Sequence, residues 1–178
     1  ASEAKMKIAS AVMKHYDEVY LIFFKSYKQE AYLMDAVNQK KVNSIEQNVN
    51  SLQSFSEQGL EKLKDLTGYN NDASLIIACR NLLTFYKEEA KKGSAMTDFF
   101  LKAENFAKLK KQLDSKTGSK RTQQDVDQFN KAVKEINDAG NDYNAINNDL
   151  NKQRSKTLDG WNNAVKRYMD EYIPVQKK

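Results

Sequence analysis

Apolar residues recur every three or four positions along most of the chain, which is the spacing of one face of an α-helix. Near the start of the chain the repeat consists of Ile8, Val12, Tyr16, Val19, Phe23, Tyr27, Ala31, Met34 and Val37. Where the repeat is interrupted, one helix is expected to end and the next to begin. The pattern predicts four helices, over residues 3–37, 44–66, 73–114 and 122–172.

The first predicted turn lies between residues 38 and 43. Residues 38–41 have no apolar anchor, and Asn43 and Glu46 have the spacing of a capping box, a signal for a new helix. This segment contains neither glycine nor proline, so one continuous helix over residues 3–66 stays open as an alternative.

The later breaks have clearer signals. Residues 67–71 and 115–119 combine glycine with other turn-forming residues, which is typical of loops. Gly93 predicts a kink within the helix over residues 73–114 rather than its end. Thr122 and Asp125 have the spacing of a cap for the last helix.

One-sided helices joined by short loops predict an all-α fold, an antiparallel up-and-down four-helix bundle that forms a single domain over residues 1–178. Because the third and fourth predicted helices are the longest, their ends are expected to project as a two-helix extension. The alternative is a three-helix, spectrin-like bundle whose first helix runs through the turn near residue 40.

The longest apolar run is Val-Tyr-Leu-Ile-Phe-Phe at residues 19–24. Six consecutive apolar residues point in every direction around a helix, so this segment is expected to be buried on more than one side. Val19 and Phe23 belong to the inward stripe, which leaves Leu21, Ile22 and Phe24 as a surplus. If no other helix covers these three side chains, they are a candidate surface for a protein partner or a second copy.

The composition excludes several kinds of site. The chain has one cysteine and one histidine, so an internal disulfide, a cysteine-based zinc site and a di-iron site with paired Glu-x-x-His motifs cannot form. Cys79 lies on an apolar stripe and is predicted to be buried. The scattered glycines form no phosphate-binding loop. We therefore expect a non-enzymatic protein without a cofactor.

One cofactor alternative remains for the single histidine, which is expected at the surface or at the boundary of the core. His15 could bind haem together with a methionine such as Met6, Met13 or Met169, as in bundle cytochromes. The adjacent carboxylates Glu88 and Glu89 are interpreted instead as part of a solvated face.

The net charge of +5 is concentrated in the middle of the chain. Most of the excess lies in Lys108, Lys110, Lys111, Lys116, Lys120 and Arg121, against Asp114. Lys108, Lys110 and Lys111 are a candidate surface for an anionic partner. The other interpretation is that these cations complement the negative end of a helix dipole. No nucleic-acid recognition motif accompanies them, so nucleic-acid binding is not expected. No segment has the roughly 20 consecutive apolar residues of a transmembrane helix.

Polar residues interrupt the inward stripe of the last predicted helix at Asn147 and Arg154. A guanidinium on the inward face needs a carboxylate partner or a place at the edge of the bundle. Asn147, Arg154 and Trp161 are therefore a candidate buried polar or ligand site. With the tyrosines of the first helix, Trp161 could also line the cavity of a carrier for a small apolar or aromatic ligand.

The last helix also carries a family resemblance. Its distinctive residues are Tyr143-Asn144, Leu150-Asn151, Arg154, Trp161-Asn162 and the closing Tyr172-Ile173-Pro174. Their spacing resembles that of uncharacterised exported helical-bundle proteins of Bacteroidota. The resemblance implies an extracytoplasmic location, in the periplasm or at the outer membrane, often through a lipid anchor upstream of this chain. It implies no activity and no functional residues.

Overall fold

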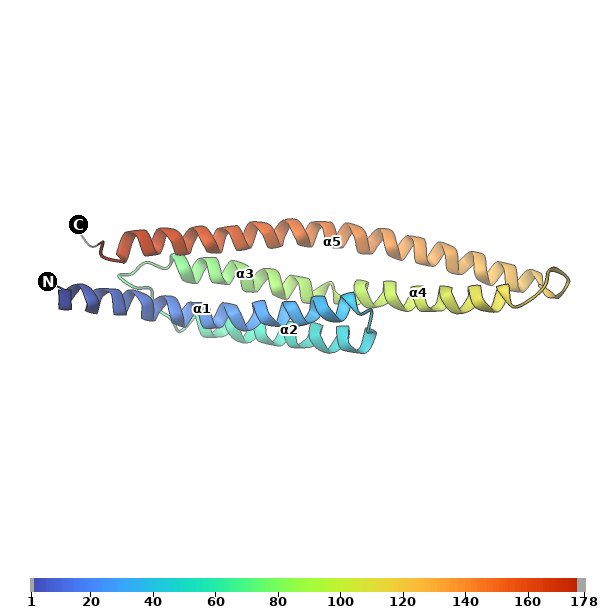
Figure 1. Cartoon of the computed structure of the whole chain (residues 1–178), viewed down its shortest axis with the longest axis horizontal. Helices are drawn as coiled ribbons and strands as arrows, with labels where there is room; N and C mark the ends of the chain where they lie inside the picture. Colours follow the sequence, from blue (N-terminus) through green and yellow to red (C-terminus); the bar gives the residue numbers. More distant parts are fainter. Residues whose placement is uncertain (1, 176–178) are drawn as a thin grey trace.

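The structure is a computed structural model that describes residues 2–175 (Figure 1). Its helices are α1 (Ser2–Asn38), α2 (Val42–Leu63), α3 (Ser74–Lys91), α4 (Gly93–Asp114), the short 3-10 helix η1 (Gly118–Lys120) and α5 (Gln123–Tyr172). Within the described residues there is no β-strand, and only an isolated bridge joins Tyr69 to Asp72. The prediction of an all-α fold is therefore confirmed.

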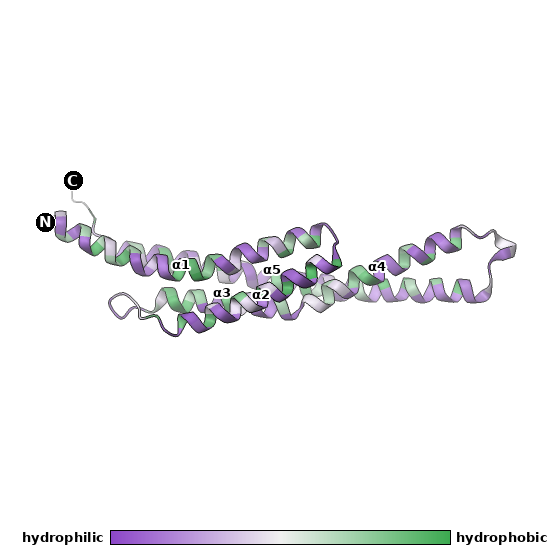
Figure 2. Ribbon diagram, turned by 90° about the horizontal axis from the view of Figure 1, so that it is seen from below, coloured by the Kyte–Doolittle hydropathy of each residue, from purple (hydrophilic) through white to green (hydrophobic). Residues whose placement is uncertain are grey.

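The helices form a group that narrows to a two-helix extension. α1, α2, α3 and the second half of α5 lie side by side, with α3 in contact with the other three (Figure 1). Contact between α1 and α5 is much sparser than contact between α3 and α5. α4 continues beyond α3 and packs against the first half of α5 (Figure 2). The expected extension is thus present, and along each helix hydrophobic and hydrophilic residues alternate as one-sided burial requires (Figure 2).

The chain turns between α1 and α2, so a continuous first helix, and with it the three-helix alternative, is wrong. Lys40 takes a left-handed conformation (φ 57°). The amide of Lys41 donates to the carbonyl of Ala36 (3.3 Å) and that of Lys40 to Val37 (3.0 Å). These bonds form a Schellman motif, in which lysine occupies the position usually held by glycine. Asn43 lies inside α2 and does not cap it.

The helix predicted over residues 73–114 is in fact two helices, interrupted at Lys92. At this break the chain approaches α2 closely: a Cβ on Gly93 would lie 2.6 Å from Cγ2 of Val49. The second predicted helix also differs, since α2 covers Val42–Leu63 rather than residues 44–66. The last helix agrees closely, and the capping box of Thr122 and Asp125 is confirmed.

Residues 19–24 are buried on one side only, so burial on several sides is wrong for this segment. Val19 and Phe23 lie in the core, whereas Leu21 is 66% exposed and Phe24 is 38% exposed. Ile22 is partly buried. Cys79 is fully buried, as predicted. None of the helices in the described part of the chain is long and apolar enough to cross a membrane.

Two helical glycines are expected to respond oppositely to alanine. Gly93→Ala should lower the free energy of unfolding by about 1–3 kcal/mol, because both γ-methyls of the stiff Val49 side chain obstruct a Cβ. Gly160→Ala should raise it by about 0.5–1 kcal/mol, because no neighbouring atom lies within 4 Å of a Cβ there. Urea denaturation of both variants measures the effects, and shifts of the same sign would contradict this account.

Candidate functional site

A surface groove of about 790 Å³ runs between α3 and α5. Its apolar side chains are mostly small: Ala78 and Ala164 lie along it with the ring of Phe85, and Ile77 is half exposed beside them. On the α5 side, Gly160 has no side chain to fill the groove, and no neighbouring atom lies within 4 Å of a Cβ placed there. The groove is thus a shallow apolar channel between two helices.

Charged and polar side chains border this groove. Glu88 is bound by Lys91 at 3.1 Å, so its charge is compensated. Lys156 and Arg167 also line the groove, and neither has a carboxylate within 4.0 Å in residues 2–175. They are eleven positions apart on α5, which is about three helical turns, so both lie on the same wall. The groove therefore has an uncompensated positive edge.

A buried ion cluster lies behind the groove. The Nε of Arg154 donates to both oxygens of Glu30 (2.9 and 3.1 Å), and its Nη2 donates to Oε2 of Glu89 (2.9 Å). Its Nη1 donates to Oδ1 of Asn151 (2.6 Å), and the guanidinium lies over the Phe85 ring at 5.3 Å. Arg154 thus finds the carboxylates that its inward position requires, and it ties α5 to α1 and α3.

The cluster contains two carboxyl groups for one guanidinium. The Glu89 side chain is 0% exposed, and its Oε1 has no hydrogen-bond partner. Burial, followed by the hydrogen bond and the charge of Glu30, raises the pKa of Glu89 to about 9, although Arg154 acts in the opposite direction. At neutral pH Glu89 is therefore protonated. The cluster is then neutral overall and suited to fixing the helices in register rather than to reacting with a solute.

The phenol of Tyr86 adds to this buried polar region. Its hydroxyl is buried without a hydrogen-bond partner. Burial, reinforced by the charges of Glu30 and Glu89, raises the pKa of Tyr86, so the phenol stays neutral.

The predicted trio of Asn147, Arg154 and Trp161 does not form one site. Asn147 is half-buried and makes no hydrogen bond to Arg154; the asparagine that accepts from Arg154 is Asn151. Trp161 packs against aromatic rings of α1, with ring centroids 5.1 Å from Phe23 and 6.4 Å from Tyr16. These rings fill the space between the helices with one another.

Sequence reasoning missed the two carboxylates and the groove. The interpretation of Glu89 as part of a solvated face is wrong: Glu89 follows the buried Tyr86 by three positions and shares its face. Glu30 was detectable, since it follows the buried Phe23 by one heptad. The sequence also contains a signal for the groove, namely a glycine in the middle of the last predicted helix. Gly160 lowers helix stability there, and no close packing contact requires it.

The apolar surface predicted on α1 is divided. Leu21 and Ile22 line a small groove between α1 and α2 together with Phe55. Phe24 lies on another side of α1, where its ring stacks against Tyr20 at 5.6 Å. The three surplus residues therefore belong to two surfaces.

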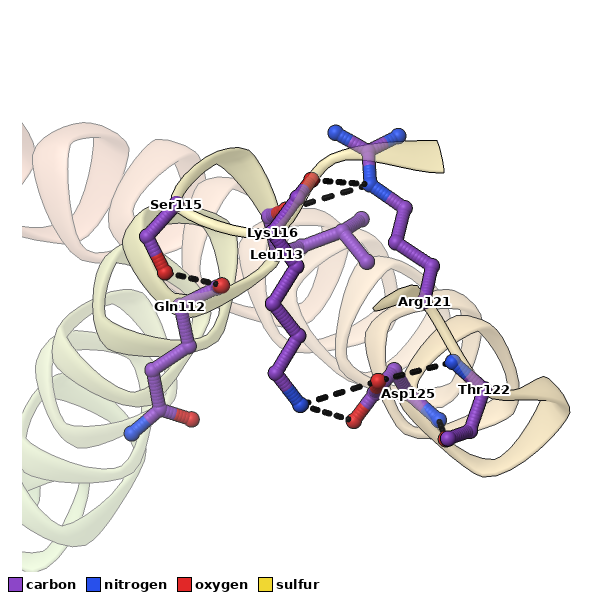
Figure 3. A network of polar contacts seen from close by, with 7 residues as sticks. All are labelled: Gln112, Leu113, Ser115, Lys116, Arg121, Thr122 and Asp125. Atoms are coloured by element: carbon purple, nitrogen blue, oxygen red, sulfur yellow. Dashed lines mark hydrogen bonds and ion pairs between the residues drawn. The ribbon is translucent and has the colours of Figure 1, made fainter. Parts of the chain in front are cut away.

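The basic segment, residues 108–121, runs from the last turns of α4 into the loop between α4 and α5 at one end of the molecule (Figure 1), and Figure 3 shows the polar contacts of this loop. Lys116 binds both carboxylate oxygens of Asp125 at 2.9 Å. Arg121 donates from Nε to the carbonyls of Leu113 (3.2 Å) and Lys116 (3.0 Å), so it closes the C-terminus of α4. These cations stabilise the loop itself.

Three further lysines of this segment remain open to solvent. Lys108, Lys110 and Lys111 are exposed along the last turns of α4. Their place near the C-terminus of the helix fits the dipole interpretation, and it leaves them accessible to an anionic partner.

His15 is buried, not at the surface or the boundary as expected. Its ring packs edge to face against Tyr168, with centroids 5.8 Å apart, and burial lowers its pKa. In the described part of the chain no group of three or more His, Cys, Asp or Glu side chains is arranged to hold a metal ion. Haem binding through His15 stays a prediction.

No protein-family model, curated protein or solved structure matches the chain. Function is therefore inferred from the groove, the buried cluster and the exposed faces of the helices.

Proposed function

We propose that this protein is a non-enzymatic up-and-down helical bundle of the bacterial cell envelope that binds a partner protein in the groove between α3 and α5. The observation that supports this most directly is the combination of an apolar channel with an uncompensated positive edge. Apolar contact supplies affinity in such grooves, and charge at the edge selects the partner.

The groove suits a helix of the partner. It is bounded by two helices and lined by Ala78, Gly160 and Ala164, whose small size lets a third backbone approach closely. Lys156 and Arg167 are separated by about 16 Å along α5, at ~1.5 Å per residue. An amphipathic helix with acidic residues about three turns apart would pair with both. The partner segment is therefore an acidic amphipathic helix.

The buried cluster supports a binding role rather than catalysis. Arg154 holds α1, α3 and α5 together, and Phe85 connects the cluster to the groove. A groove with fixed walls loses little conformational entropy on binding, which favours affinity. The envelope location rests on the family resemblance of α5, and protease accessibility on intact cells tests it.

Photo-cross-linking in the native host tests the groove. A photoreactive amino acid at position 160 should give a discrete protein adduct, because Gly160 lies inside the groove and tolerates a side chain. The same amino acid at the exposed position of Lys152, outside the groove lining, is the matched control. Equal adducts from both positions would contradict the proposal.

Charge reversal then tests the edge. Lys156→Glu with Arg167→Glu is expected to reduce the position-160 adduct at least about tenfold, because both cations would face an acidic helix as like charges. Lys108→Glu with Lys110→Glu, a matched reversal at the distant tip, should leave the adduct unchanged. Loss of the adduct only in the tip variant would move the docking surface to α4.

A small apolar or aromatic ligand is the second candidate for the same groove. Its volume of about 790 Å³ falls within the roughly 300–1,000 Å³ of small-molecule sites. Native mass spectrometry of protein purified from its host would detect a bound ligand. Gly160→Leu should abolish that signal, and in this case position 160 gives no protein adduct.

A further inference from the structure

Exposed apolar side chains are concentrated on one helix. Of the large apolar residues that are exposed in the described part of the chain, seven lie on α1: Met6, Ile8, Met13, Leu21, Phe24, Tyr27 and Tyr32. Only Ile77, Leu101 and Val175 lie elsewhere. A soluble surface that gathers apolar residues in this way usually marks a site of interaction.

Several of these residues continue a second apolar seam along α1. Val12, Val19 and Leu33 of the buried seam recur with heptad spacing. The residue after each of them, and after the buried Ser26 that completes the heptad series, is apolar or aromatic, which gives a parallel row one position later: Met13, Tyr20, Tyr27 and Met34, with Phe24 and Ala31 between them. One position corresponds to about 100° around a helix, so this outer seam lies beside the buried one.

The outer seam is ordered as well as apolar. The rings of Tyr16 and Tyr20 stack at 5.6 Å, those of Tyr20 and Phe24 at 5.6 Å, and those of Phe24 and Tyr27 at 6.3 Å. Tyr27 nevertheless remains 45% exposed. The sparse contact between α1 and α5 leaves this row open. Stacked rings lose little side-chain entropy on binding, and aromatic residues are enriched in interfaces.

We propose that two copies of this chain associate through the outer seam, with the two α1 helices antiparallel. The surface goes beyond the proposed groove, which lies between other helices. From Tyr20 to Met34 the residues of the outer seam are spaced alternately four and three positions apart. This is the spacing of the apolar residues through which one helix packs against another in a coiled coil. A two-fold axis pairs the same seam of both copies, so one apolar row satisfies both partners.

The charges beside the seam favour the antiparallel direction. Lys14, Leu21, Lys28 and Asp35 form the next row, again with heptad spacing. An axis near Phe24 places Lys14 opposite the partner's Asp35, and Leu21 beside the partner's Lys28. In a parallel pair this row would instead face the row on the other side of the partner's seam, so Lys14 and Asp35 would not meet.

The size of the seam predicts a dimer of moderate strength. The part that an axis near Phe24 pairs, from Met13 to Met34, is about 32 Å long at ~1.5 Å per residue. With a width of roughly 15 Å it covers on the order of 500 Å² per chain, at the lower limit for specific interfaces. We therefore expect a dissociation constant of about 1–10 µM.

Sedimentation velocity of the chain from about 1 to 200 µM tests the dimer. The mass should rise towards twice the 20.5 kDa of one chain. Phe24→Glu with Tyr27→Glu should weaken association at least about tenfold, with an unchanged circular dichroism melt as evidence of folding. Leu101→Glu, an equally exposed apolar residue of α4, is the control and should leave association unchanged.

Charge exchange tests the orientation. Lys14→Asp should weaken the dimer, and Lys14→Asp combined with Asp35→Lys should restore it. A wild-type chain that stays monomeric at about 200 µM overturns the proposal, as does a dimer that resists the Phe24/Tyr27 variant. A dimer that the double exchange fails to restore overturns the antiparallel arrangement.

Discussion

Replacing Arg154 by methionine is expected to lower the free energy of unfolding by about 3–5 kcal/mol, because it leaves the buried carboxyl groups without their cation. The guanidinium binds Glu30 and Glu89 at 2.9 Å, and all three side chains are largely withdrawn from water. Urea denaturation near neutral pH measures the loss. Arg167→Met on the exposed face of α5 is the matched control, with an expected change within about 0.5 kcal/mol.

A triple variant separates loss of packing from loss of charge. Arg154→Met with Glu30→Gln and Glu89→Gln removes all the ionisable groups of the cluster together. Because buried ion clusters are often replaceable by neutral groups, most of the lost stability should return. If the single variant were no less stable than Arg167→Met, the cluster could not be buried as described.

Glu89 is expected to make the protein less stable as the pH rises from about 5 to about 9. Burial and Glu30 raise the pKa of this carboxyl from 4.5 to about 9 on folding. In that window the folded state binds more protons than the unfolded state, so raising the pH favours unfolding. The slope for one group is at most about 1.4 kcal/mol per pH unit.

Glu89→Gln isolates this effect, because the amide keeps the shape of the protonated acid and does not titrate. Urea denaturation at several pH values measures the free energy of unfolding. As the pH rises, this free energy should fall less for the variant than for the wild type, so that near pH 9 the variant is the more stable of the two. His15 acts in the opposite sense below its ordinary value of 6.5, since burial lowers its pKa. It is present in both proteins and cancels in the comparison. Parallel pH curves would contradict protonation of Glu89.

The sequence was sufficient for features that depend on local spacing. The 3-4 periodicity located the helices, and Thr122 with Asp125 marked the start of α5 because a capping box is contained within four residues. The turn near residue 40 was predicted from the missing apolar anchor, but its form was not, since Lys40 adopts a left-handed conformation that glycine usually occupies. At Lys92 only a kink was predicted, and the close approach of Gly93 to Val49 of α2 is a tertiary contact that no local spacing reveals.

The candidate site was predictable only in part, because it depends on contacts between residues that are far apart in the sequence. An inward arginine at position 154 follows from the heptad frame of α5. Its partners Glu30 and Glu89 are 124 and 65 positions away, so no local pattern connects them. The groove depends on how far apart α3 and α5 lie, which is a property of the assembled helices.

The path of α5 also determines how far the protein reaches. The start of α1 and the end of α5 lie at one end of the molecule, and the loop between α4 and α5 lies at the other (Figure 1). The 50 residues of α5 span most of that distance, about 75 Å at ~1.5 Å per residue. A partner bound at Lys108 and Lys111 near the end of α4 would therefore lie almost the full length of α5, about 75 Å, from the start of α1.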